Sequence, residues 1–140
     1  MTNRKLDFIV QDQNPLTLTA SATVKEACAQ MWARRVGAVL VTDADRRLVG
    51  IFTGRDAVRM LAEGGNAATT TLSQVMTPQP KTLGPASTAI EALREMRNGG
   101  FRHMPVVDEG RILGIISRGD FLGLELDRLE EETNLWERIG

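Results

Sequence analysis

The chain has 140 residues, of which 42% are apolar and 25% are charged, and its formal net charge is −1. This composition is typical of a globular protein and argues against a disordered chain. The balanced charge gives no sign of the concentrated basic face that duplex nucleic acid requires. No apolar run approaches the roughly 18 residues of a membrane span. We therefore expect a soluble, cytoplasmic protein that binds neither nucleic acid nor membrane.

The first predicted elements are a short strand and a helix. Residues 16–18 form an extended segment directly after a proline. Thr23 and Glu26 have the spacing of a capping box, in which a hydroxyl and a carboxylate satisfy free backbone N–H groups at a helix start. Apolar residues then recur at helical spacing, and Gly37 follows the helix. The single cysteine, Cys28, lies among these apolar residues and is expected to be a buried structural thiol.

Two strands and a second helix complete this first unit. The strands are predicted at 39–41 and 48–52, with an aspartate-rich turn between them. The second helix is predicted to begin at Asp56 and to end at the glycine pair of residues 64–65. The unit therefore has the order β-α-β-β-α.

The same pattern occurs a second time, and its second helix is predicted to begin at Asp120. Pro15 and Pro80 are 65 residues apart, and Asp56 and Asp120 are 64 apart. A fixed period over nearly the whole chain indicates an internal repeat, and two copies suggest a pseudo-symmetric pair that shares one core. We predict an α/β (α+β) fold of two tandem β-α-β-β-α units. The predicted boundaries are 9–66 for the first unit, 67–74 for a linker, 75–125 for the second unit and 126–140 for a helical tail.

The tail has no counterpart in the first repeat. Leu122, Leu126, Leu129 and Trp136 are spaced so that they fall on one side of a helix. We expect this apolar side to pack either on the module itself or on a second subunit.

The repeated pattern resembles the CBS domain pair, also called a Bateman module. The matching motifs are 50–56, read as GIFTGRD, and 114–120, read as GIISRGD. Both are similar to the family's G-x-x-[T/S]-x-x-D signature, and residues 102–108 are similar to its strand motif. The resemblance covers roughly residues 9 to 125.

The resemblance implies two units related by a pseudo-two-fold axis, with clefts between them that take adenosine-containing ligands: AMP, ADP, ATP or S-adenosylmethionine. It implies ribose contacts for the signature aspartates, hydroxyl contacts to ribose or phosphate for the signature Thr and Ser, and adenosine contacts for two earlier threonines. It also implies dimers. Carried over by position, the ribose candidates are Asp56 and Asp120, the hydroxyl candidates Thr53 and Ser117, and the adenosine candidates Thr17 and Thr82.

The signature has a second interpretation that needs no ligand. Thr53 with Asp56, and Ser117 with Asp120, also have the spacing of a capping box, so either pair can simply start a helix. The two interpretations are compatible, because a helix start also offers free N–H groups to a phosphate.

Basic residues distinguish the two repeats. The second carries Arg102 and His103 where the first carries glycine and alanine. In proteins that this chain resembles, basic residues at this point face phosphates, and His103 would add a proton-dependent contact. The alternatives are a solvated charge for Arg102 and a half-buried strand residue for His103. Arg55 and Arg118, inside the two signatures, are further phosphate candidates or loop charges. We therefore expect two unequal sites.

The residue inventory argues against catalysis. One histidine and one cysteine do not supply a zinc set or a nucleophilic constellation, and no P-loop is present. We expect no required cofactor, and a stand-alone regulatory module that senses adenine nucleotides as a homodimer or through a protein target in trans. The alternative is a ligand-free scaffold for dimerisation or protein interaction.

Overall fold

The computed structural model describes residues 4–121, 123, 125, 126 and 128–132. Their fold is mixed α and β, and the chain divides into two compact units. We call Asn14–Lys81 with Glu109–Ile112 the first-repeat unit. The second-repeat unit consists of the described parts of Met1–Gln13, Thr82–Asp108 and Leu113–Gly140. The tandem β-α-β-β-α fold predicted from the sequence is confirmed.

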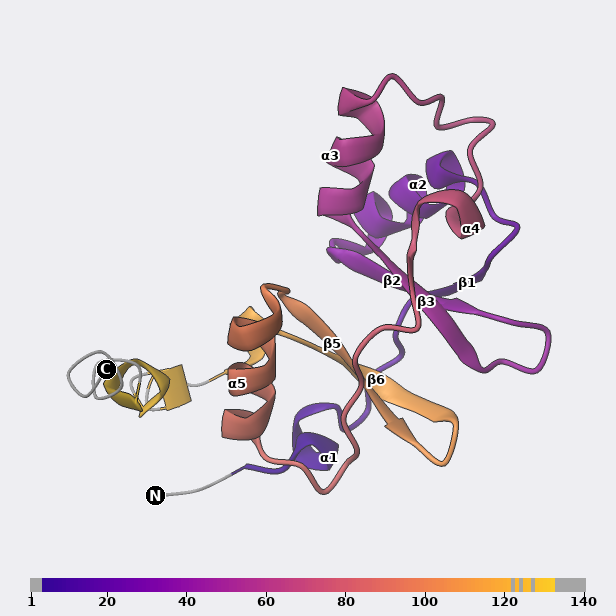
Figure 1. Cartoon of the computed structure of the whole chain (residues 1–140). Coiled ribbons are helices and arrows are strands. Elements are labelled where there is room, and N and C mark those ends of the chain that lie inside the picture. Colours follow the sequence, from indigo (N-terminus) through magenta and orange to yellow (C-terminus); the bar gives the residue numbers. More distant parts are fainter. Residues whose placement is uncertain (1–3, 122, 124, 127, 133–140) are drawn as a thin grey trace. The chain divides into compact units, whose positions relative to one another are not determined.

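The first-repeat unit contains a four-stranded sheet (Figure 1). Its strands are β1 (Thr17–Thr19), β2 (Ala38–Thr42), β3 (Leu48–Thr53) and β4 (Thr77–Pro78). β1 is parallel to β2, and β3 is antiparallel to both β2 and β4. The helices are α2 (Val24–Arg34), α3 (Gly54–Ala62) and the single turn α4 (Leu72–Val75). Every residue of β2 is buried, so this strand forms the centre of the unit's core.

The start of α2 was predicted from the sequence, but its exact end was not. The capping box is confirmed, with the Glu26 N–H donating to Thr23 Oγ1 over 3.1 Å. The helix ends at Arg35, which has left-handed backbone angles (φ 57°), and Gly37 follows two residues later. The Arg35 guanidinium lies over the Trp32 ring at 4.8 Å from its centroid. This cation–π contact offsets part of the strain of a non-glycine residue in that conformation.

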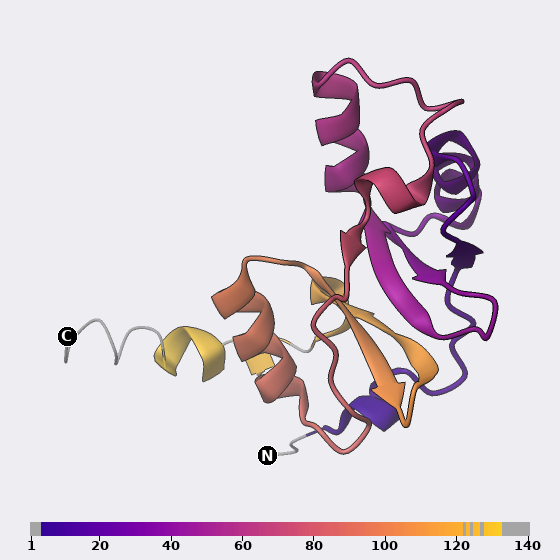
Figure 2. The ribbon, with the colours of Figure 1, turned by 45° about the vertical axis from the view of Figure 1, so that its right-hand side comes forward.

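The second-repeat unit contains a two-stranded sheet of β5 (His103–Asp108) and β6 (Arg111–Ser117). Leu83 forms a parallel bridge to Val106, which corresponds to the pairing of β1 with β2. The helices are α1 (Leu6–Ile9) and α5 (Ala89–Gly99), and α5 begins with the predicted capping box and ends at a left-handed Gly100. Figure 2 shows α5 lying along one side of this unit.

The second helix of this repeat does not begin at Asp120 as predicted. Arg118–Asp120 form only the 3₁₀ turn η1, and Phe121 is extended (φ −95°, ψ 145°). Phe121 is buried in the core of the unit, and the extended backbone that places its ring there interrupts the helix. The described residues from Gly123 to Glu132 are helical.

The tail packs on its own unit. Leu129 is buried in the core of the second-repeat unit, and Leu126 packs against that core. Of the two environments expected for the apolar side of the tail, the structure therefore has these two leucines on the module itself. Leu122 and Trp136 lie outside the described residues.

Each repeat is completed by the segment that precedes the other repeat. Residues 4–10, ahead of the first repeat in sequence, pack on the second, and residues 70–76 pack on the first. Residues 67–74, predicted as a linker, thus include much of α4. In the first-repeat unit, the Val24 N–H donates to Thr70 O and the Leu72 N–H to Ala22 O, both over 2.9 Å. The equivalent bonds of the second-repeat unit run from the Ala89 N–H to Arg4 O (2.8 Å) and from the Leu6 N–H to Ser87 O (2.9 Å).

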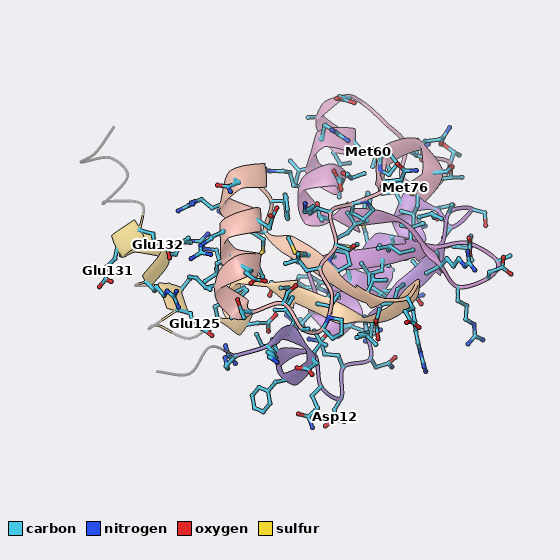
Figure 3. All side chains as sticks on the ribbon, turned by 60° about the horizontal axis from the view of Figure 1, so that its bottom comes forward. Asp12, Met60, Met76, Glu125, Glu131 and Glu132 are labelled. Atoms are coloured by element: carbon cyan, nitrogen blue, oxygen red, sulfur yellow. The ribbon has the colours of Figure 1, made fainter. Side chains whose placement is uncertain are left out.

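The signature glycines permit these segments to approach the strands. A Cβ on Gly114 would lie 2.7 Å from the Cβ of Val10, and a Cβ on Gly50 would overlap the sulfur of Met76. Met76 is labelled in Figure 3, in the first-repeat unit. Packing therefore favours the glycine of the signature, more strongly at Gly114 than at Gly50, independently of any ligand.

Candidate functional site

The same turn joins strand to helix at the end of both signatures. Asp56 Oδ2 accepts hydrogen bonds from the backbone N–H (2.9 Å) and hydroxyl (3.1 Å) of Thr53. Asp120 Oδ2 accepts from the backbone N–H (2.7 Å) and hydroxyl (3.3 Å) of Ser117. Both pairs have the geometry of a capping box. The capping interpretation is therefore confirmed for the first repeat, where the pair starts α3, whereas in the second repeat the pair starts only the 3₁₀ turn η1.

The cap uses only one oxygen of each carboxylate. Asp56 is buried, and its Oδ1 lies 3.7 Å from the guanidinium of Arg59, a long ion pair. Asp120 is half-buried, and among the described residues no donor is hydrogen-bonded to its Oδ1. An ionised carboxylate oxygen accepts more than one hydrogen bond, so each aspartate keeps acceptor capacity beyond its cap. That capacity is more accessible at Asp120.

His103 lies within electrostatic range of Asp120. Its ring is half-buried at the start of β5, and burial is the largest cause of a lowered pKa. The charge of Arg102 lowers the pKa further, whereas the Asp120 carboxylate raises it. At neutral pH the ring is therefore mainly uncharged, since its ordinary pKa is already 6.5. Arg102 itself is exposed.

The ten predicted site residues divide between the two units. Contacts join Thr53 to Asp56 and Ser117 to Asp120, and the charge of Asp120 acts on His103. Arg55 and Arg118 are exposed and Thr82 is half-buried. The first-repeat unit holds Thr17, Thr53, Arg55 and Asp56, and the second-repeat unit holds Thr82, Arg102, His103, Ser117, Arg118 and Asp120.

Thr17 is not in contact with the signature residues of its own unit. It is exposed on β1 and lines a groove together with Thr19, Thr42 and the turn at 43–47. β2 lies between β1 and β3, and it pairs Leu40 with Thr17 but Ala38 with Thr53. Two strand spacings, roughly 10 Å, therefore separate Thr17 from the signature threonine.

Sequence reasoning missed Arg4. Its guanidinium donates to the backbone oxygen of Asp120 over 2.9 Å and forms a two-point ion pair with Glu125. No local motif marks Arg4, because its partners lie 116 and 121 residues away in the chain. Only the packing of the N-terminal segment on the second repeat would have indicated it.

The described residues lack two other kinds of feature. They contain no group of three or more His, Cys, Asp or Glu side chains arranged to hold a metal ion. Within the same residues, no helix combines the length and apolar character needed to cross a bilayer. Cys28 is half-buried, and burial raises the pKa of its thiol, which keeps it protonated at neutral pH.

Comparison with known proteins identifies a repeated family. The model of the CBS domain matches residues 8–63 and again residues 72–127. The CBS domain-containing protein CBSCBSPB2 of Arabidopsis thaliana is 43% identical over 117 residues, which are 83% of this chain and 22% of the relative. The chain thus spans about a fifth of the length of that relative.

Solved structures show the same architecture. A CBS domain protein from Pyrobaculum aerophilum, complexed with AMP, has a TM-score of 0.82 at 24% identity, covering 91% of this chain and 99% of that one. The CBS domain pair of protein MJ0100, in complex with 5′-methylthioadenosine and S-adenosyl-L-methionine, has a TM-score of 0.78 at 22% identity, covering 94% and 99%. At these identities the likeness establishes the fold.

Proposed function

Because the chain belongs to the CBS domain family and carries two CBS domains, we propose that it is a regulatory module that binds an adenosine-containing ligand. AMP, ADP, ATP and S-adenosylmethionine are the candidate ligands. The module acts without catalysis, needs no cofactor, and passes its signal through its own dimer or to a protein target in the cytoplasm. The proposal is supported by the AMP and S-adenosylmethionine complexes of proteins with the same fold.

The observation that carries the proposal is that each signature aspartate uses only one carboxylate oxygen for its cap. Asp120 Oδ2 is held by Ser117, which fixes the direction of Oδ1. A fixed, ionised oxygen suits the cis hydroxyl pair of a ribose, because it can accept a hydrogen bond from each. Thr53 and Asp56 present the same arrangement in the first repeat. Ribose is the part that all the candidate ligands share.

Cations supply the second part of the proposed site. Arg102 and Arg118 are exposed in the same unit as Asp120. The negative charge of Asp120 raises the pKa of His103. Arginine binds phosphate oxygens in pairs, and an approaching phosphate raises the pKa of a nearby imidazole. We therefore assign phosphate contacts to the second repeat first, with Arg55 as the candidate in the first. Thr17 and Thr82 are assigned to the adenosine portion.

The test is thermal unfolding of nucleotide-stripped protein with AMP, ADP, ATP or S-adenosylmethionine. A ligand at a hundred times its Kd adds about 2.7 kcal/mol, a shift of several degrees for a chain of this size. Asp120→Asn keeps an oxygen for the cap and loses the charge that favours ribose, so it should reduce the shift with little change in Tm without ligand. Asp56→Asn is the matched variant, with a smaller expected loss. If no ligand produces a shift, a sensing function is excluded for these compounds.

A second function, protein interaction, is favoured by a separate observation. Four large apolar residues on or just after α2 and α3 are exposed, and we call this set the α2–α3 face: Trp32, Val36, Val58 and Leu61. Trp32 is 72% and Val58 67% accessible. The two helices are neighbours, since the Gly54 N–H at the start of α3 donates to the carbonyl of Gly37 (3.1 Å) just after α2. Exposed large apolar side chains on adjacent helices favour an interaction surface.

We propose that this face forms the contact through which the chain dimerises. Sedimentation equilibrium of wild type, Trp32→Ala and Leu61→Ser tests this assignment, with Phe8→Ala as a control at an exposed apolar residue of the other unit. A dimer that dissociates only in the first two variants supports the assignment. A monomeric wild type, or a dimer insensitive to both changes, contradicts it.

A further inference from the structure

Arg4 joins three parts of the second-repeat unit. Its backbone oxygen accepts the Ala89 N–H that begins α5 (2.8 Å). Its side chain reaches the Asp120 backbone and the Glu125 carboxylate. The Arg4 and Glu125 side chains are only 17% and 10% exposed. A salt bridge this sheltered is costly to break, because either partner left alone is a partly buried charge.

The Arg4 guanidinium binds the Glu125 carboxylate and the Asp120 carbonyl at once, and we call this set of contacts the clamp. Nε donates to Glu125 Oε2 over 3.2 Å, and Nη2 donates to Glu125 Oε1 over 2.7 Å and to the Asp120 oxygen over 2.9 Å. The donors of an arginine lie in one plane at fixed separations. Arg4 therefore fixes the carboxylate and the carbonyl relative to each other, and the Glu125 hydrogen bond raises the pKa of the guanidinium further.

The first repeat does not need such a clamp. Asp56 lies in the nine-residue helix α3, whose own backbone hydrogen bonds hold it. Asp120 lies in a three-residue 3₁₀ turn that ends at the extended Phe121. Short 3₁₀ turns have weak internal hydrogen bonds, so an external partner is required to hold the carbonyl of Asp120. Thr70 takes the place of Arg4 in the first repeat, since its backbone oxygen accepts the Val24 N–H as that of Arg4 accepts the Ala89 N–H. Glu125 corresponds to Leu61 by the repeat spacing, and threonine and leucine cannot form an ion pair.

We propose that Arg4 is the positioning residue of the Asp120 site and that it links this site to the N-terminal segment and to the tail. The proposal rests on the proposed function, in which Asp120 binds ribose. Asp120 is held from both sides, with its carboxylate on Ser117 and its carbonyl on Arg4. Ligand at Asp120 therefore stabilises the docking of residues 4–10 and of the tail, and their docking strengthens ligand binding by the same factor.

The test compares Arg4→Met with Glu125→Gln in the full chain. Arg4→Met removes both contacts, whereas Glu125→Gln removes the ion pair and leaves Arg4 able to donate to the Asp120 carbonyl. We expect Arg4→Met to weaken AMP binding about tenfold or more by calorimetry, in keeping with loss of a charged hydrogen bond. Glu125→Gln should weaken it less than about threefold. Lys25→Met, which removes an exposed charge from α2, is the control and should leave the affinity unchanged.

Two comparisons separate positioning from general stability. Equal losses in Arg4→Met and Glu125→Gln, or no loss in Arg4→Met, would overturn the proposal. If Arg4→Met does not fold, Arg4→Gln replaces it. Its amide nitrogen ends two bonds short of Nη2, the atom that donates to both Glu125 and the Asp120 carbonyl. AMP binding should therefore again weaken more than in Glu125→Gln, and equal binding would overturn the proposal.

Hydrogen exchange distinguishes failure of this proposal from failure of the proposed function. The Ser117 N–H donates to Asp120 Oδ2, so its exchange in ligand-free protein reports how well Asp120 is held. We expect Arg4→Met to accelerate this exchange at least tenfold and Glu125→Gln to leave it nearly unchanged. If AMP and the other candidate ligands do not bind wild type, the sensing function fails, and the clamp is still judged by this exchange. Unchanged exchange in Arg4→Met overturns the clamp.

Discussion

The two repeats make the same local turn in different surroundings. In both, the carboxylate of an Asp accepts hydrogen bonds from the backbone N–H and the hydroxyl of a Thr or Ser three residues earlier, at the strand end. Asp56 is then buried in a regular helix beside Arg59, whereas Asp120 stands half-buried in a 3₁₀ turn near His103. Short-range pattern thus determines the cap, and distant residues determine how the carboxylate is presented.

The helices of the two repeats also differ in their surroundings. In the second repeat, the tail covers α5, and Arg94 forms a two-point ion pair with Glu132 at 2.6 and 2.9 Å. In the first repeat, α2 and α3 leave Trp32 and Val58 exposed. The repeat with the uncovered helices is therefore suited to contact another molecule, and the repeat with the covered ones is closed within its own chain.

The largest expected difference concerns the two cores. Phe52 and Ile116 occupy equivalent positions of β3 and β6, and both are fully buried. Phe52→Ala should lower the free energy of unfolding by about 4 kcal/mol and Ile116→Ala by about 3, since the phenyl ring leaves the larger cavity. Urea denaturation measures both. A larger loss for Ile116→Ala would mean that the two cores do not correspond in packing.

The signature glycines provide a smaller contrast. Gly114→Ala brings a methyl against the Cβ of Val10, which moves only with its backbone, and should cost about 2 kcal/mol. Gly50→Ala meets the flexible side chain of Met76 and should cost about 1 kcal/mol. Gly54→Ala, with nothing within 4 Å, is the control. Thermal unfolding ranks the three variants, and equal costs at Gly50 and Gly114 would contradict the assigned contacts.

A pH dependence should belong to the second repeat alone. The pKa of His103 is lower in the folded than in the unfolded chain, so the unfolded chain binds more protons as the pH falls through about 6.5. The contribution of His103 to the free energy of unfolding is therefore complete above that pH and is partly lost below it. The loss is less than about 1 kcal/mol after solvent screening. Unfolding at pH 7.5 and 5.5 should show this loss in wild type and not in His103→Gln. A loss of the same size in both proteins would assign it to other groups.

The smallest expected effect is at the tail. The hydrogen bond from Arg94 lowers the pKa of Glu132, so the pair stabilises the fold above the ordinary pKa of 4.5 and loses this effect as the pH falls. Both side chains are partly exposed, so Glu132→Gln should cost only about 0.5 kcal/mol at pH 7. Glu131, which points away from α5 in Figure 3, gives the control Glu131→Gln. Equal effects of the two changes would contradict the contact.

Sequence patterns gave much of the fold because its signals are local. Capping boxes at Thr23 and Thr88 and the strand–turn–strand spacing each lie within a few residues, and the structure has them as predicted. The end of α2 at Arg35 was missed because a left-handed arginine next to Trp32 depends on a side-chain contact that no propensity describes.

The site was less predictable. The pairing of Thr53 with Asp56 follows from spacing, but Arg4 depends on which repeat the N-terminal segment packs against. The late helix start after Asp120 depends on the burial of Phe121. Contacts across a hundred residues have no periodic signal in one sequence, so only the structure supplies them.

Because each repeat is completed by the segment that precedes the other repeat, the order of synthesis on the ribosome affects how the two repeats fold. Residues 4–10 are made first, but α5 and β6, on which they pack, are complete only after Ser117. At roughly 5–20 residues per second, this delay is on the order of 5 to 20 s. During that time the apolar side chains of Leu6 and Val10, buried in the finished chain, have no final partner. The first repeat, by contrast, is closed by a segment made directly after it, so the nascent chain acquires its two halves in a fixed order.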